Sequence, residues 1–217
     1  IVEKRIVSDR RVLPYDPIRE ADIFWEKRVW RVLDVREKMN LPFAYPEEPF
    51  FSILMKAAAE GEITVYGTED DKFSYPLAPD EVSSMGATVD TIIAFDPETY
   101  EEEITIVRND LNPEDIKQFR IKEIWFFDEE ASQLKVRIIG IAPVLDVVDP
   151  ETMIVKYPEL KFWIYYPTAR EYLSKHRVIS DENDVARMTW ADLFEARFFS
   201  SYIYKITKSH SNRGNTP

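Results

Sequence analysis

Strand-like runs joined by short polar turns fill the middle of this chain of 217 residues. In these runs the apolar residues recur with a period near two, which is typical of a β-strand. Residues 91–95 and 103–107 flank one turn, and residues 120–127 and 134–141 flank another. Strands joined by so short a turn run antiparallel. The pattern therefore predicts an antiparallel sheet in the middle of the chain.

Other segments extend this predicted sheet or cover it. Their apolar residues follow either the strand period or the helical period, and Gly61 is placed to end one of the helices. The further predicted elements are strands at Ile63–Tyr66, Phe73–Tyr75 and Lys161–Tyr166, and helices at Phe50–Glu60, Asp80–Met85 and Thr168–His176.

The segment Asp22–Asn40 combines both charge signs with two tryptophans at helical spacing, within a predicted helix that Asp16-Pro17 opens and Leu41-Pro42 ends. On a helical projection of about 100° per residue, Trp25 and Val29 join the apolar stripe, whereas Trp30 falls roughly 140° from Trp25. Burying both tryptophans therefore requires this predicted helix to be covered on two sides. The second cover is either the chain's own sheet or another subunit.

The last predicted helix runs from Thr189 to Ile206. The Thr189 hydroxyl can cap it together with Asp192, three residues on. Three aromatic residues then recur at i, i+4 and i+8, namely Phe194, Phe198 and Tyr202. The whole pattern predicts an α+β fold, with a central antiparallel sheet covered by N-terminal and C-terminal amphipathic helices.

The length fits one domain that buries about 70% of its unfolded surface. We expect an N-terminal arm at residues 1–15, a single α+β domain at residues 16–207 and a polar C-terminal tail at residues 208–217. No apolar run approaches the ~20 residues needed to cross a bilayer, so we expect a soluble chain with no direct membrane span. The absence of cysteine excludes disulfides and thiolate chemistry.

The net charge of −12 is unevenly distributed. Residues 41–115 hold 3 basic against 18 acidic residues, whereas residues 1–40 hold 10 against 8 and residues 116–217 hold 15 against 14. This pattern is unsuited to a nucleic-acid binder, which needs a basic stripe to displace counterions from phosphate. The acidic middle is either a solvated face or a surface that meets the basic ends of a neighbouring subunit.

The sequence shows no catalytic, cofactor-binding or metal-binding constellation, so we expect none of these sites. His176 and His210 lack neighbouring triad or metal partners, and the five glycines are not grouped as a phosphate loop requires. The acidic runs read as solvated turns or as a strand with alternating faces. Among these acidic runs, the residues best suited to a weak calcium site are Asp181, Asn183 and Asp184.

Two aromatic segments, Ile124–Phe127 and Phe162–Tyr166, place bulky residues on both faces of their strands. Either helices cover both faces or one face contacts another chain. The segment Leu145–Val155 suits a strand edge that could pair with a partner strand.

The run WEKRVWRVLDVREKMN, with Leu13–Asp22 before it and Leu41–Tyr66 after it, resembles the gliding-motility and type IX secretion family GldN/PorN of Bacteroidetes. The resemblance extends through Lys122–Pro143 and Thr189–Ile206. It implies a non-enzymatic subunit of a periplasmic ring, held at the outer membrane through a lipoprotein partner, GldK/PorK. It also implies contact with the periplasmic part of the motor protein GldM/PorM, and homo-oligomeric contacts within a hetero-oligomeric ring.

The same resemblance supplies no catalytic motif. We therefore expect partner contacts, and the candidates are Ile23, Arg28, Trp30 and Arg31. Two other classes of function stay open on the residues: a carboxylate-based hydrolase with an acidic cleft, and a soluble protein-binding adaptor of the cytoplasm.

Overall fold

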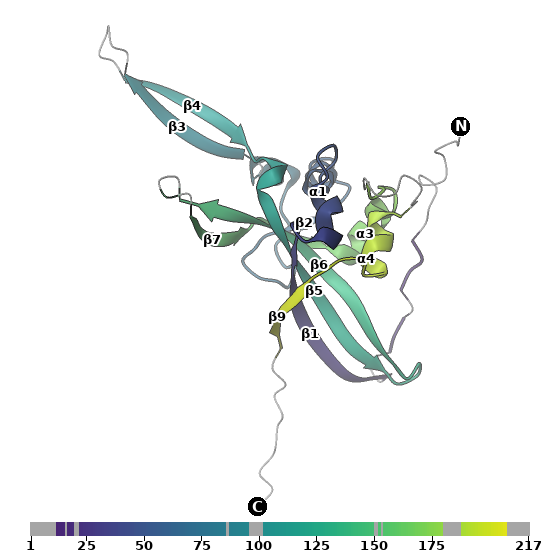
Figure 1. Ribbon diagram of the computed structural model, residues 1–217. Coiled ribbons are helices and arrows are strands. Elements are labelled where there is room, and N and C mark those ends of the chain that lie inside the picture. The colour runs from purple at the N-terminus through teal and green to yellow at the C-terminus, as the bar shows by residue number, and fades with distance from the viewer. Residues whose placement is uncertain are drawn as a thin grey trace, which may run out of the picture.

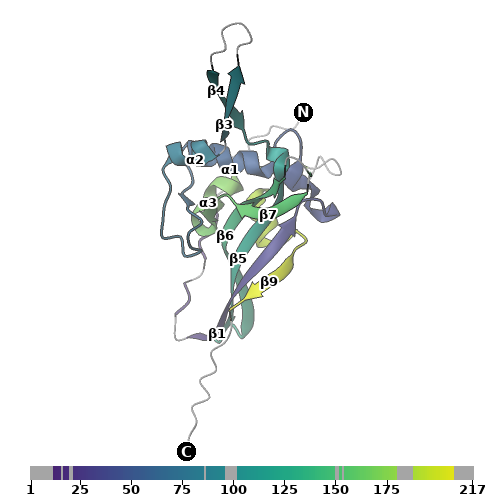
Figure 2. The same cartoon turned by 90° about the vertical axis from the view of Figure 1, so that its left-hand side faces the viewer.

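A computed structural model describes residues 12–15, 17–19, 22–85, 87–95, 102–149, 152, 154–179 and 188–207. Its main feature is a seven-stranded antiparallel sheet with helices packed against one face (Figures 1 and 2). A separate two-stranded sheet projects from the body beyond the helices. The predicted α+β class and the central antiparallel sheet are confirmed.

The first and last strands of the described chain lie side by side at one end of the main sheet. Because they come from opposite ends of the sequence, their pairing brings the two ends of the described chain into one sheet. The order is β2 (Val65–Tyr66), β8 (Trp163–Tyr165), β6 (Gln133–Val148), β5 (Ile116–Asp128), β1 (Ile23–Asp34) and β9 (Tyr202–Ile206), and β7 (Val155–Leu160) pairs with β6.

Both strand pairs that the period-two pattern predicts most clearly are confirmed. β5 and β6 form a long hairpin at the centre of the sheet, in which Ile121 lies opposite Ile141. The projecting hairpin consists of β3 (Ala87–Phe95) and β4 (Glu102–Asp110). Each pair is longer than predicted, because the sequence signal fades toward the strand ends.

The described residues form four short helices: α1 (Phe50–Ala59), α2 (Pro79–Met85), α3 (Tyr166–Ser174) and α4 (Trp190–Glu195). A 3₁₀ segment, Lys38–Ala44, lies between β1 and α1, and another, Pro113–Asp115, lies between β4 and β5. The predicted end of α1 is confirmed, since Gly61 has a φ of 73° directly after its last turn. The predicted capping box is confirmed as well: Thr189 Oγ1 accepts from Asp192 N, and Asp192 Oδ2 accepts from Thr189 N.

A cluster of aromatic rings fills the space between the helices and the sheet. The ring centroids of Phe50 and Trp190 lie 4.3 Å apart, those of Phe43 and Trp190 4.9 Å apart, and those of Phe50 and Phe119 5.4 Å apart. These side chains, with Phe194, are at most 2% exposed. Each such buried ring contributes a large apolar area and adds edge or tilted ring contacts. This cluster fixes α1 and α4 on the sheet.

The predicted helix over Asp22–Asn40 is wrong: the segment forms strand β1 and continues into a 3₁₀ turn. β1 lies between β5 and β9 and pairs with both. A strand covered on both faces is apolar on both, so its pattern can match a helical stripe. The expected roles of the tryptophans are also reversed, because Trp25 is 39% exposed and Trp30 only 5% exposed.

The predicted C-terminal helix ends eleven residues early, at Glu195, and the chain continues as β9. Arg197 takes a φ of 58°, its amide donates to Phe194 O, and the Phe198 amide donates to Leu193 O. These are the two hydrogen bonds of a Schellman motif, which terminates a helix and usually has glycine at the left-handed position. Because arginine and not glycine takes this conformation, the sequence does not show that the helix ends here. The predicted row of buried aromatic residues is also wrong at Phe198, which is exposed.

The second face of the sheet is covered by a loop and not by helices. Phe73, from the loop between β2 and α2, lies against Tyr66, Trp163 and Tyr165. A Cβ added at Gly140 would lie 2.5 Å from the Phe73 ring, so glycine permits this approach. The predicted strand Phe73–Tyr75 is wrong: this part of the chain makes only a bridge between Tyr66 and Pro76.

Several predictions fall outside the described residues: most of the N-terminal arm, the tail at 208–217 with His210, and the calcium candidate at Asp181, Asn183 and Asp184. The division into arm, domain and tail stays a prediction. Within the part of the chain that is described, no helix is long and apolar enough to span a membrane.

Candidate partner-binding face around strands β1 and β9

All four residues predicted to contact a partner lie on β1. Ile23 begins the strand opposite Asp128, and Arg28, Trp30 and Arg31 follow in its middle. Their side chains divide between the two faces because successive residues of a strand alternate. The strand thus brings these four residues onto one element but not onto one surface.

Trp30 is held on the face opposite the helices. It forms a small apolar cluster with Ala142 and Trp163, against which Tyr66 and Phe73 pack. Its strand neighbours are Lys122 on β5 and Lys205 on β9, whose ammonium groups lie 5.6 Å and 4.3 Å from the indole ring centroid. Such cation–π contacts stabilise the ring's position. The cover that Trp30 requires comes from its own chain.

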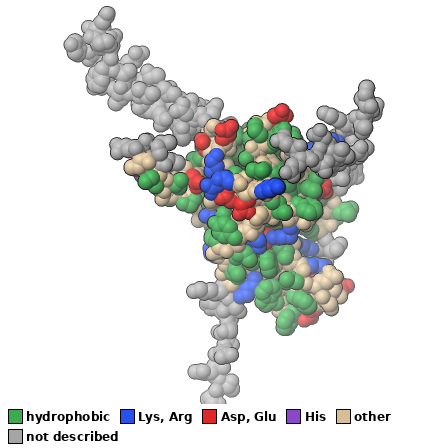
Figure 3. Space-filling view, viewed as in Figure 1, with side chains coloured by type: hydrophobic (Ala, Val, Ile, Leu, Met, Phe, Trp, Pro, Cys, Tyr) green, Lys and Arg blue, Asp and Glu red, His purple; other side chains and the backbone are tan. Residues whose placement is uncertain are grey.

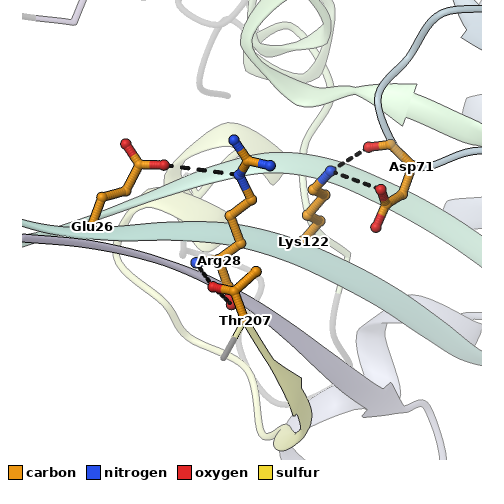
Figure 4. A network of polar contacts seen from close by, with 5 residues as sticks. All are labelled: Glu26, Arg28, Asp71, Lys122 and Thr207. Carbon is orange, nitrogen blue, oxygen red and sulfur yellow. Dashed lines mark hydrogen bonds and ion pairs between the residues drawn. The ribbon is translucent and has the colours of Figure 1, made fainter. Parts of the chain in front are cut away.

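Lys122 joins the sheet to the loop that carries Asp71 (Figure 4). Its ammonium group donates to the Asp71 carbonyl oxygen and lies 3.4 Å from Asp71 Oδ1. Burial lowers the pKa of Lys122, and the charge of Asp71 opposes part of this shift. A buried ammonium group with one acid beside it holds the loop against the sheet.

Arg28 is the exposed member of the four candidates. Its side chain is 52% exposed, and its guanidinium lies 3.8 Å from Glu26 (Figure 4). Its backbone is fixed by β9, because the Arg28 amide donates to Thr207 Oγ1 at 3.0 Å and the Thr207 amide donates to Arg28 O at 3.0 Å. A rigid backbone with an exposed guanidinium is suited to contact with an acidic group.

Arg31 points to the other face and fixes the segment that leads into β9. Its guanidinium donates to Ser201 Oγ and to Ser201 O, both at 2.9 Å. Nearby, Glu123 is fully buried and accepts from Arg197 at 2.6 Å and from Trp125 Nε1 at 2.7 Å. Burial lowers the pKa of Arg31, while Glu123 counteracts this. These contacts make Arg31 a structural residue.

β9 carries the largest exposed apolar surface near these residues. Tyr202, Ile203, Tyr204 and Ile206 are each between 39% and 54% exposed. The Arg120 guanidinium stacks on the Tyr204 ring at 4.3 Å. In the space-filling view, Lys and Arg side chains lie among apolar side chains over the lower strands (Figure 3). This combination of exposed apolar and basic groups was not predicted, because β9 reads as part of a helix.

A second exposed apolar row crosses the far end of the sheet. Trp25 lies opposite Phe127, which lies opposite Leu134, and the three are 39%, 36% and 54% exposed. Residues directly opposite one another on adjacent strands share one face. The row is therefore a continuous apolar patch of three side chains from β1, β5 and β6.

The end of the N-terminal arm docks on its own domain. The Tyr15 ring lies 3.9 Å from the Arg170 guanidinium and 4.7 Å from that of Arg137, and its hydroxyl donates to Glu195 Oε1 at 2.8 Å. The same carboxylate oxygen accepts from the Tyr166 hydroxyl at 3.1 Å. Burial and then the charge of Glu195 raise the pKa of both tyrosines. No sequence signal pairs Tyr15 with residues 180 positions away.

The acidic turn after β5 is less solvated than predicted. Asp128 is buried, accepts from Lys135 Nζ at 2.7 Å and also accepts from the Ala131 amide. It lines an open cavity of about 340 Å³ with Glu130 and Pro17. The hydrogen bond from Lys135 is the main cause that lowers the pKa of Asp128, whereas a general acid needs a raised pKa. Asp128 is therefore unsuited to the acid role that the hydrolase alternative requires.

Metal-ligand geometry is also missing from the described part of the chain, where no three His, Asp or Glu side chains are grouped to hold an ion. His176 has a structural environment, with its Nδ1 3.1 Å from Tyr172 O and its ring stacked on Tyr172.

Comparison with known proteins gives one family. The family model described as "Gliding motility associated protein GldN" matches residues 18–216. No curated protein matches the chain. The matched span includes every strand and helix described above.

Proposed function

The chain belongs to the gliding motility associated GldN family, and on this premise we propose that it is a non-enzymatic structural subunit of the periplasmic ring of the type IX secretion and gliding machinery. Its partners in this proposal are the outer-membrane lipoprotein GldK/PorK and the periplasmic part of the motor protein GldM/PorM. The observation that carries the proposal is the extent of the family match, which spans nearly the whole chain. The proposed location is the periplasm, at the outer membrane through the lipoprotein.

Two surfaces of the molecule support a role in assembly. One is the β9 strand with its exposed tyrosines and isoleucines, and the other is the row formed by Trp25, Phe127 and Leu134. Large apolar side chains that gather on an exposed surface mark contacts with other proteins more often than isolated ones do. A ring subunit needs separate contacts for its neighbours and for its tether, and the two surfaces lie on different parts of the sheet.

The mechanism in this proposal is mechanical. Successive copies meet through different surfaces, and such heterologous contacts produce a closed ring when the rotation between copies closes. Backbone pairing joins β1 to both β5 and β9, and the ion pair between buried Glu123 and Arg197 ties β5 to the segment that leads into β9. Because the sheet is rigid, each contact between successive copies has the same geometry and therefore the same rotation.

Affinity capture with the lipoprotein tests this function and the predicted role of Arg28. The chain and its lipoprotein partner are co-expressed, and the lipoprotein is captured from the membrane fraction. We expect the wild-type chain to be retained, and Arg28→Glu to reduce the retained amount at least threefold.

The matched control is Lys175→Glu, a charge reversal at a 43% exposed lysine on the helical side. Both variants must show the circular dichroism spectrum of the wild type. Retention of no chain at all would contradict the proposed function. Equal retention of both variants would contradict only the role of Arg28.

A further inference from the structure

No described strand covers the outer edge of β9. Among the described strands it pairs only with β1, so its outer N–H and C=O groups face away from the sheet. The other edges are blunted: β7 contains Pro158, and β2 has two residues and a bridge to Pro76. Natural proteins protect exposed sheet edges with proline, short strands or bulges, and an unprotected apolar edge is a template for another strand.

The surroundings of this edge are positively charged. Lys205 lies within β9, Arg28 lies beside it on β1, and Arg120 stacks on Tyr204. Glu26 is the acidic group beside Arg28, and Asp71 pairs with Lys122 deeper in the sheet. The exposed bases at the edge exceed the exposed acids, which favours an acidic strand as the added partner.

The projecting β3–β4 hairpin has the complementary properties. Its described residues hold four acids, Asp90, Glu102, Glu103 and Asp110, against the single base Arg108. The register places Ile93 opposite Ile104 and Thr91 opposite Ile106. A two-stranded hairpin is at best marginally stable in water, so pairing with a further strand would stabilise this one.

The positions of the two elements exclude pairing within one copy. In both Figure 1 and Figure 2 the hairpin projects from one end of the molecule and β9 lies toward the opposite end. An outward hairpin and a remote receiving edge on each copy make a head-to-tail contact possible.

We propose that the β3–β4 hairpin of one copy of this chain adds to the free edge of β9 in the next copy. This contact rests on the proposed role as a ring subunit and identifies how successive subunits meet. The backbone of the hairpin extends the main sheet across the subunit boundary, and its acidic residues lie near Lys205 and Arg28 of the receiving copy.

Site-specific photo-crosslinking of the assembled complex tests this contact. The side chain of Tyr204 is replaced by p-benzoylphenylalanine, the chain is co-expressed with the lipoprotein, and the purified assembly is irradiated. We expect adducts that join position 204 of one copy to residues 87–110 of another. The matched control is the same replacement at Glu171, whose side chain is 76% exposed on α3 and which should give no such adduct.

The outcomes separate this contact from the proposed function. A large assembly with adducts from position 204 to the lipoprotein, or to residues 208–217 of the same chain, would overturn the hairpin contact and leave the ring intact. Absence of any assembly would overturn both.

A charge exchange gives a second, independent test. We expect Lys205→Glu and Glu103→Lys each to weaken self-association about fivefold, since each places like charges together. When the two variants are mixed, every junction between different variants should be restored, because one orientation pairs the two exchanged charges and the other pairs the unchanged Lys205 with the unchanged Glu103. Sedimentation velocity measures this, and failure of the mixture to exceed either variant would count against the contact.

Discussion

The two tryptophans of β1 have opposite environments, and the difference has a measurable cost. Trp30 is 5% exposed and is surrounded by Trp163, Phe73 and two lysine side chains, whereas Trp25 is 39% exposed at the end of the sheet. Removal of a buried aromatic side chain leaves a cavity and forfeits its transfer free energy.

We therefore expect Trp30→Ala to lower the free energy of unfolding by about 3–5 kcal/mol, and Trp25→Ala to lower it by less than about 1 kcal/mol. Urea denaturation followed by circular dichroism measures both values. Because Trp30→Ala destabilises the fold, a loss of partner binding in this variant would not identify a contact. The partner role of Trp30 is therefore tested with Trp30→Phe, which keeps an aromatic ring in the core. Equal costs for the two alanine variants would contradict the described burial.

The buried hydroxyl of Tyr166 makes stability fall at alkaline pH. Its pKa is raised from the ordinary value of 10.0 by burial, then by the charge of Glu195, and also by Tyr15. Above pH 10 the unfolded chain loses this proton and the folded chain keeps it, so the folded state is disfavoured as the pH rises. Below pH 10 the contribution is fully present.

We expect Tyr166→Phe to flatten this decline by about 1 kcal/mol per pH unit between pH 10 and 11.5, since the unfolded tyrosine is half deprotonated at pH 10 and the limit for one whole proton is about 1.4 kcal/mol per pH unit. Urea unfolding at a series of pH values measures the two slopes. Tyr75→Phe, at a 56% exposed tyrosine, is the control and should leave the slope unchanged. Parallel slopes for wild type and Tyr166→Phe would show that the hydroxyl does not titrate differently in the two states.

At the scale of elements, the strands were predictable where the period-two pattern met a short turn, and unpredictable where both faces are covered. The β5–β6 and β3–β4 hairpins belong to the first kind. β1 belongs to the second, because valine and tryptophan on both faces produce an apolar stripe at helical spacing as well. The end of α4 was hidden because Arg197, and not glycine, takes the left-handed conformation.

The loop that covers the second face of the sheet depends on one glycine. A Cβ at position 140 would lie 2.5 Å from the Phe73 ring and 3.1 Å from the Trp163 ring. We expect Gly140→Ala to lower the free energy of unfolding by about 1–3 kcal/mol through this overpacking.

A double-mutant cycle identifies the cause. In a Phe73→Ala background the space for the new methyl group is available, so Gly140→Ala should cost at least ~1 kcal/mol less than it does in the wild type. Denaturant unfolding of the four proteins gives the coupling free energy. Strict additivity would mean that Phe73 does not cover Gly140.

At the scale of the whole molecule, the family was predicted from the residues of β1 and its flanks, although the secondary structure of that segment was wrong. The family match over residues 18–216 confirms the assignment. Surfaces built from distant segments were not predictable, because Tyr15 meets Glu195 and Lys205 meets Trp30 only after folding. The four predicted partner residues stay a prediction, with Arg28 the most accessible.

Native mass spectrometry of the chain co-expressed with its lipoprotein partner tests the central claim most directly. The proposed function predicts a large, closed assembly that contains many copies of both proteins, and negative-stain images that show a ring. A chain that stays monomeric, with the same mass whether or not the lipoprotein is present, would contradict it.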